Sequence, residues 1–148
     1  MSLAAVLAAL LVGAPSSETP ARFMTRILED EIHGKWALQW RELHPGHQAL
    51  ISETQYVACS RAMGTDFATG REVVRVVSVR NEPIDVLGVP QRTSKVVTIT
   101  LRQREKTNGL TYHLHAVRVD GRWRWILGKR FLDQVAQGRC LDGSPLPR

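Results

Sequence analysis

The stretch that decides the fold is LTYHLHAVRVDGRWRWILGKR, which runs from Leu110 to Arg130. It consists of two runs of extended character that are separated by Asp120-Gly121. A two-residue Asp-Gly connection between such runs is the strongest short-range signal of a β-hairpin. This turn fixes the register, so residues whose numbers sum to 241, as 120 and 121 do, are predicted to lie opposite each other.

Alternation along the two strands sorts their residues into two faces. The apolar face holds Leu110, Tyr112, Leu114, Ala116 and Arg118 opposite Phe131, Lys129, Leu127, Trp125 and Trp123. The mixed, basic face holds His113, His115, Val117 and Val119 opposite Gly128, Ile126, Arg124 and Arg122. We expect the first face to lie in the core, with Trp125 and Trp40 largely buried, and the second to be positively charged.

Helices are predicted ahead of the strands. Apolar residues recur at intervals of three or four from Met24 to Leu43, which indicates one stripe of an amphipathic helix. Gly34 interrupts this stripe and Pro45-Gly46 ends it, so one long, bent helix is expected. The residues SETQ at 52–55 form a capping box that starts a second, shorter helix, which Gly64 ends.

Strands are predicted at 71–80 and 93–104, with a loop at 64–70 and a turn-rich connection at 81–92. The fold class is therefore α+β. A long bent N-terminal helix and a short helix pack on a curved, mostly antiparallel sheet of four or more strands. The predicted organisation is a linker at 15–20, one domain at 21–137 and a C-terminal tail at 138–148.

The N-terminal segment 1–14 contains the apolar run LAAVLAALLV from Leu3 to Val12. This run is too short to span a bilayer but suits a secretory signal, with Val12 and Ala14 placed as a cleavage site requires. No Lys or Arg precedes it. The segment therefore indicates a secreted or cell-envelope protein, or else a buried helix of a cytoplasmic one.

Cys59 and Cys140 are the two cysteines of the chain, and their spacing does not match a zinc or redox motif. In an oxidising compartment they would pair as a disulfide. Otherwise they would be buried as small apolar residues.

The net charge is +6, which permits contact with an anionic surface. On the mixed face, Arg122 and Arg124 are the candidates for such contact. Nucleic acid is not an expected partner, because binding would require aromatic residues between the arginines, and the aromatic residues fall on the apolar face.

The segments WALQWRELHP, ETQYVACSRAM and YHLHAVRVDGRWRWIL resemble the superfamily of nuclear transport factor 2, which includes ketosteroid isomerase and polyketide cyclase-like proteins. More narrowly, the chain is similar to small exported bacterial members of unassigned function. The resemblance spans roughly residues 22–131. It implies a cone-shaped fold with a concave pocket, but no particular activity, because this fold carries many functions.

Six aromatic residues on the predicted apolar stripes are candidates for lining such a pocket or for filling the core. They are Trp36, Trp40, Tyr56, Tyr112, Trp123 and Trp125. A family-type acid–base site would also need a carboxylate, for which Asp66 and Asp85 are the candidates, but neither lies in a motif that matches the isomerase pattern. The preferred hypothesis is a non-catalytic, exported binding or interaction module with a small apolar pocket. The alternative is a small isomerase- or cyclase-type enzyme that uses a carboxylate and a tyrosine.

Two pairs of histidines are candidates for metal ligands. His113 and His115 share one face of a strand, but their predicted neighbours add no further ligand. His44 and His47 flank Pro45-Gly46 where the first helix ends. No metal or other cofactor is expected. The expected partners are a small apolar ligand, another protein or a second copy of the chain.

Overall fold

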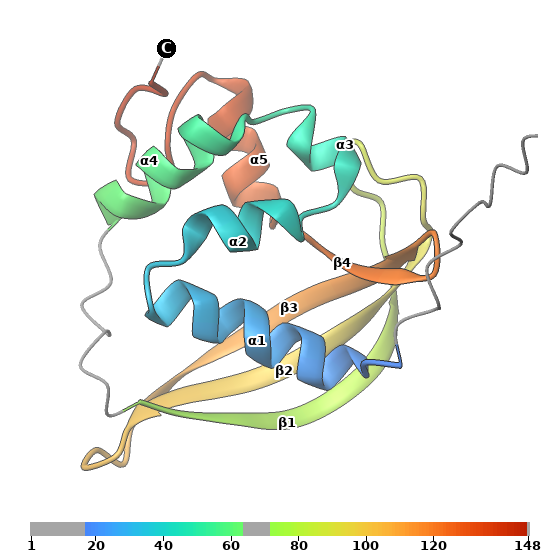
Figure 1. Cartoon of the computed structure of the whole chain (residues 1–148), viewed down its shortest axis with the longest axis vertical. Helices are drawn as coiled ribbons and strands as arrows, with labels where there is room; N and C mark the ends of the chain where they lie inside the picture. The colour runs from blue at the N-terminus through green and yellow to red at the C-terminus, as the bar shows by residue number, and fades with distance from the viewer. Residues whose placement is uncertain (1–16, 64–71, 148) are drawn as a thin grey trace, which may run out of the picture.

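A computed structural model describes residues 17–63 and 72–147 of the chain. Within these ranges, five helices pack against one open antiparallel sheet with the strand order β1-β2-β3-β4 (Figure 1). The strands are β1 (Glu72–Pro83), β2 (Thr93–Gln103), β3 (Gly109–Val119) and β4 (Arg122–Ile126). The helices are α1 (Pro20–Ile32), α2 (Trp36–Arg41), α3 (Pro45–Gln48), α4 (Glu53–Met63) and α5 (Lys129–Ala136). The predicted α+β class is confirmed, and the arrangement is consistent with a cone-like fold.

Some predictions fall on residues that the structure does not describe. They are the apolar segment 1–14, the end of the second helix at Gly64, and the loop 64–70 with Asp66. Helix α1 begins at Pro20, and the Thr19 hydroxyl caps it by accepting the backbone N–H of Arg22 at 3.2 Å.

The hairpin register is confirmed over five pairs, from Val119 opposite Arg122 to His115 opposite Ile126. Asp120 and Gly121 both have positive φ, as a two-residue hairpin turn demands. The predicted pairs beyond Ile126 are wrong, because β4 ends there and the chain enters α5 (Figure 1). Apolar residues at 131, 132 and 135 follow a helical spacing, which carries Lys129 and Phe131 away from the sheet.

The predicted long helix is two helices, α1 and α2. Gly34 lies between them with φ of +67°, a conformation that ends a helix rather than bending it. The backbone N–H of Lys35 donates to the carbonyl of Asp30 at 2.7 Å and closes the turn. Pro45 does more than end a helix, because it also occupies the first turn of α3, where its missing N–H is not needed.

The main core lies between α1 and the apolar face of the sheet (Figure 1). The buried residues of α1 recur at helical spacing, which places them all on the side that faces the strands. They are Phe23, Met24, Ile27, Leu28 and Ile32, and they meet Val97, Ile99, Leu101, Ala116 and Trp123.

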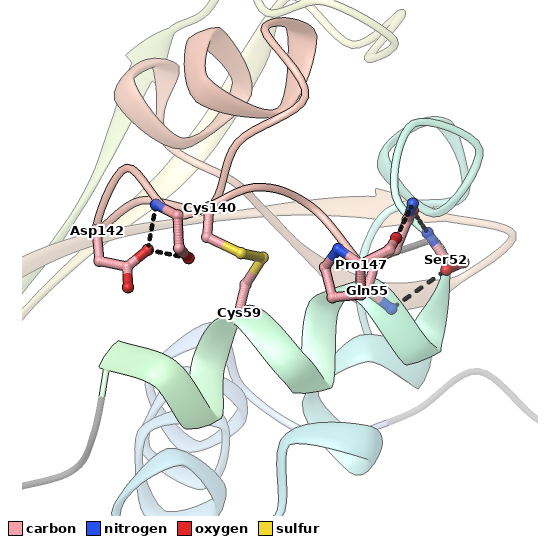
Figure 2. The surroundings of a disulfide bond; sticks show 7 residues. Ser52, Gln55, Cys59, Cys140, Asp142 and Pro147 are labelled. Carbon is pink, nitrogen blue, oxygen red and sulfur yellow. Dashed lines mark hydrogen bonds between the residues drawn. A yellow bond between two sulfur atoms is a disulfide. The ribbon is translucent and has the colours of Figure 1, made fainter.

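The capping box of α4 is formed as predicted, with reciprocal hydrogen bonds of 3.2 Å between Ser52 and Gln55. The disulfide between Cys59 and Cys140 is also formed, with a Cα–Cα distance of 5.2 Å (Figure 2). Near it, the Gln55 side-chain amide donates to the carbonyl of Pro147 at 3.0 Å. The C-terminal tail is therefore fastened to α4 at two places.

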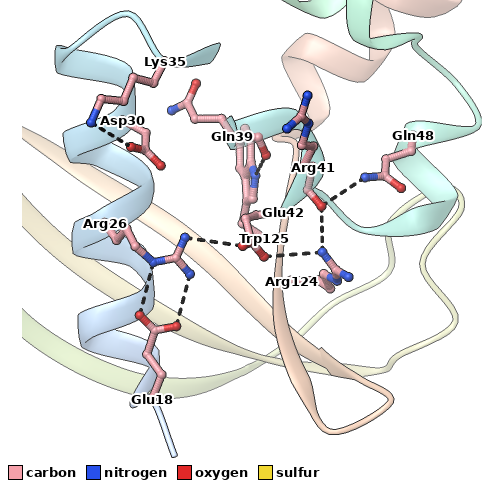
Figure 3. Close-up of polar contacts among 10 residues, drawn as sticks. All are labelled: Glu18, Arg26, Asp30, Lys35, Gln39, Arg41, Glu42, Gln48, Arg124 and Trp125. Atoms are coloured by element: carbon pink, nitrogen blue, oxygen red, sulfur yellow. Dashed lines mark hydrogen bonds and ion pairs between the residues drawn. The ribbon is translucent and has the colours of Figure 1, made fainter. Parts of the chain in front are cut away.

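The mixed face of the hairpin is less open than predicted. Val117 and Ile126 are buried against Val89, which belongs to the connection between β1 and β2. Arg124 turns to the carbonyl of Arg41 at 2.7 Å and to the Glu42 carboxylate at 3.4 Å (Figure 3). Arg122 is exposed. Of the two arginines proposed for anionic contact, one is thus already paired within the protein.

The same Glu42 carboxylate meets Arg26 at 3.4 Å, and Arg26 meets Glu18 at 3.2 Å (Figure 3). These alternating charges connect the beginning of α1, the end of α2 and β4. None of the helices in the described ranges has the length and apolar composition that crossing a membrane requires.

Candidate ligand-binding site

A cavity of about 340 Å³ opens between the C-terminal end of α1, α2, α4, β3, β4 and the segment around α5. Most of its wall is apolar or aromatic, with a few polar side chains among the rings. The lining residues of the wall are Glu31, Trp36, Gln39, Tyr56, Ser60, Met63, Tyr112, Trp125, Leu127, Gly128, Arg130, Phe131 and Leu141. Small-molecule sites commonly have this combination of an apolar wall and few polar groups.

Four of the six aromatic candidates line this cavity, namely Trp36, Tyr56, Tyr112 and Trp125. The other two do not. The indole N–H of Trp40 donates to the carbonyl of Ile51 at 2.9 Å, and that of Trp123 donates to the carbonyl of Glu18 at 2.8 Å. Both therefore serve in holding the fold. Trp40 and Trp125 are partly buried and pack against the buried core residues.

Gln39 forms three hydrogen bonds that connect the elements of the cavity wall. Its side-chain amide donates to the carbonyl of Ile27 at 2.8 Å, while its side-chain oxygen accepts the hydroxyl proton of Tyr56 at 3.1 Å. Its backbone carbonyl accepts the indole N–H of Trp125 at 2.8 Å (Figure 3). A buried amide with partners at each of these atoms fixes α1, α4 and β4 relative to one another.

Tyr56 is the most enclosed ring of the wall. It meets Trp125 edge to face, with ring centroids 6.2 Å apart, and Phe131 at a tilt, with centroids 6.1 Å apart. Burial raises the pKa of the Tyr56 hydroxyl far above its usual value, and the nearby Glu31 raises it further. Tyr56 is therefore neutral, and its hydroxyl donates a hydrogen bond to Gln39.

Glu31 is the carboxylate of this cavity, and the sequence did not single it out. It is exposed at the mouth of the cavity, where desolvation raises the pKa of its carboxyl and a hydrogen bond with Gln39 lowers it. Glu31 lies three residues after Leu28, at the border of the apolar stripe of α1. In the last turn of a helix the dipole disfavours negative charge. A carboxylate at this position was therefore the one feature of the sequence that could have marked Glu31 as a site residue.

Tyr112 reaches the cavity from β3 and is half-buried. Burial raises the pKa of its hydroxyl, with a further contribution from Glu31. Within residues 17–63 and 72–147, the Tyr112 hydroxyl forms no hydrogen bond, so it can bind a ligand. Asp85, in contrast, pairs with Arg92 at 2.9 Å with its side chain in solvent, which places this base candidate outside the cavity.

The four histidines of the two candidate pairs have protein partners. The ring of His113 meets the Thr98 hydroxyl at 3.2 Å, and the ring of His115 meets the Ser94 hydroxyl at 2.9 Å. His44 bonds to Gln91, while His47 accepts from the backbone of Leu127 and bonds to the carbonyl of Leu87. In the part of the chain that the structure describes, no three His, Cys, Asp or Glu side chains gather as a metal site would require.

Comparison with known proteins does not assign this cavity a role. No family model matches the chain, and neither a curated protein nor a solved structure matches it. The resemblance to nuclear transport factor 2-like proteins therefore stays a prediction, and the function has to be inferred from the cavity itself.

Proposed function

We propose that the protein is a binding module that takes a small molecule with an apolar, ring-containing body into the cavity beside α2 and α4. The observation that carries this proposal is the wall itself. Five aromatic side chains and a carboxyl surround a space of about 340 Å³, which lies within the size range of small-molecule sites. Rings held in fixed positions lose little freedom on binding, which favours affinity.

The Gln39 hydrogen bonds support a preformed site. Because Tyr56 and Trp125 are both bonded to Gln39, their rings hold their positions without a ligand. The polar groups left for a ligand include the Tyr112 hydroxyl, Glu31 and the exposed Arg130. We further propose that the protein is exported and belongs to the nuclear transport factor 2-like superfamily. The disulfide and the pocket support this view.

Tryptophan indole N–H signals in a ¹⁵N–¹H NMR spectrum test the proposal site by site. Ligands from a panel of small aromatic compounds should shift the signals of Trp36 and Trp125, which line the cavity. The signals of Trp40 and Trp123 should stay in place, because neither residue lines the cavity. Uniform shifts of all four signals, or none with any ligand, would contradict the proposal.

A matched pair of variants locates the binding further. Leu141→Phe should weaken binding, because Leu141 lines the cavity and a larger side chain would occupy it. Leu87→Phe adds the same bulk at a residue that is 65% exposed on the β1–β2 connection, so it should leave binding unchanged.

The second candidate function is the small acid–base enzyme, and Glu31 favours it. A carboxyl with a raised pKa beside Tyr112 is the kind of pair that moves a proton to or from carbon next to a carbonyl group. Deuterium uptake by a cyclic ketone in D₂O tests this role. Uptake that Glu31→Gln abolishes would support the enzyme, and uptake equal to the buffer rate would support simple binding.

A further inference from the structure

Three donors of the cavity wall are engaged within the protein. The Tyr56 hydroxyl, the Trp125 indole N–H and one N–H of the Gln39 amide all end on protein oxygens. Apart from the Tyr112 hydroxyl and the exposed Arg130 side chain, the wall therefore offers a ligand ring faces and the oxygens of Glu31. Ring faces carry negative electrostatic potential, as the carboxylate does, so both attract positive charge.

The Glu31 carboxylate has no basic partner in the described parts of the chain. By contrast, the adjacent Asp30 on α1 meets Lys35 at 4.0 Å, and Glu42, which follows α2, meets both Arg26 and Arg124. A carboxylate left without a cation beside a group of aromatic rings matches the recognition of organic ammonium groups.

We propose that the cavity binds an organic cation, an inference that rests on the proposed small-molecule function. Glu31 is the counter-ion, and the rings of Trp36, Tyr112 and Trp125 lie against the positive charge. The ligand class is an ammonium group, methylated or not, on an apolar body. A quaternary ammonium suits the wall because it has no N–H that needs an acceptor, while the ring faces accommodate its methyl groups.

Arg130 is the one basic residue among the lining residues, and it is exposed on α5. Its charge opposes a bound cation. The variant Arg130→Gln should therefore raise the affinity for a cation. If the cavity instead takes an anion, the same variant should lower the affinity for that anion.

Three probes of similar size separate these cases. Phenyltrimethylammonium is a cation, tert-butylbenzene has the same shape with carbon in place of nitrogen, and phenylacetate is an anion. Titration followed by the Trp36 and Trp125 indole signals should give at least tenfold tighter binding for the cation than for tert-butylbenzene. Glu31→Gln should remove this preference and leave tert-butylbenzene binding unchanged, which also shows that the variant is folded. Glu29→Gln, an equal charge change at an exposed residue on the same helix, should keep the preference.

The pH dependence provides a second readout. The titratable groups facing the cavity are Glu31 from α1, Tyr56 from α4, Tyr112 from β3 and Arg130 from α5. Burial raises the pKa values of both tyrosines, so they stay neutral in acid, whereas Glu31 takes up a proton there. Affinity for the cation should fall as Glu31 takes up a proton, whereas affinity for tert-butylbenzene should not change.

The outcomes distinguish the two proposals. Equal affinity for cation and neutral probe, tighter binding of phenylacetate, or a preference that survives Glu31→Gln would each overturn the cation inference while leaving the binding function in place. No shift of the Trp36 and Trp125 signals with any of the three probes would overturn both.

Discussion

The hydroxyl of Tyr56 donates to the side-chain oxygen of Gln39 across 3.1 Å, and both groups are buried. Replacing Gln39 with Leu would keep most of the volume but leave the Tyr56 hydroxyl without its acceptor and the Ile27 carbonyl without that donor. We expect this variant to lower the free energy of unfolding by about 2–4 kcal/mol. Tyr56→Phe removes only one partner and should cost about 1 kcal/mol. Denaturant unfolding with the disulfide intact measures both, and the double variant should cost less than the sum. Strictly additive costs would show that the two groups do not depend on each other.

Removing the disulfide should weaken both the fold and the site. The bond closes a loop with a sequence separation of 81, for which loss of chain entropy predicts at most about 4.5 kcal/mol of stabilisation. Cys59 and Cys140 are direct neighbours of Ser60 and Leu141 in the cavity wall, so ligand affinity should fall as well. Dithiothreitol should therefore lower the unfolding midpoint of the native protein. The variant with both cysteines replaced by Ala should show the lower midpoint throughout and no response to the reductant.

Acid should destabilise the fold through His44 and His47, since both rings accept a backbone N–H on Nδ1. Burial lowers both pKa values below the ordinary value of about 6.5, so the unfolded chain binds more protons than the native one. Their stabilising contribution is complete above pH 6.5 and is lost as the pH falls through their lowered pKa values. The raised pKa of Glu31 acts in the opposite direction at lower pH, because there the native state binds the extra proton.

Urea unfolding between pH 8 and pH 5 measures this dependence. In the variant His47→Gln, an amide takes the place of the ring without an ionisation in this range, so the slope of stability against pH should decrease. A variant with the full slope of the native protein would assign the dependence to other groups, of which His115, whose pKa is also lowered, is the first to test.

Gly46→Ala should be strongly destabilising. A Cβ at this position would lie 1.7 Å from the carbonyl oxygen of Gly88, so α3 and the β1–β2 connection would have to separate. We expect a loss of about 3 kcal/mol or more in the free energy of unfolding. Gly128→Ala is the control, because its Cβ would meet nothing within 4 Å. It should cost no more than about 1 kcal/mol through the N-cap of α5. Similar losses in the two variants would argue against a close approach of the two chain segments.

The sequence allowed prediction of those features that depend on neighbours along the chain. The hairpin register followed from Asp120-Gly121, and the start of α4 from the capping box at Ser52, because both signals act within a few residues. The sequence located the interruption at Gly34, but it did not show whether the helix bends or ends there. A glycine within an apolar stripe is compatible with a bend or with a positive φ, and the structure has the positive φ.

Features that depend on distant segments were beyond the sequence. Glu31 and Tyr112 belong to different elements 81 positions apart, and nothing local indicates that one cavity brings them together. The turn of Arg124 towards Glu42 likewise depends on residues 42–44 lying along the edge of β4. The alternation of polar and apolar residues assigns side chains to one face of a strand or helix. It does not show which distant segment covers that face.

The Cys59–Cys140 bond encloses all four strands and α5 in one covalent ring. A protease that cuts once within the ring, for example at the exposed Leu87, would therefore not divide the protein. The nicked molecule would migrate as one band until reductant is added and would then separate into two. Proteolytic damage in an oxidising compartment would thus leave the helices of the N-terminal half joined to the C-terminal segment that completes the cavity.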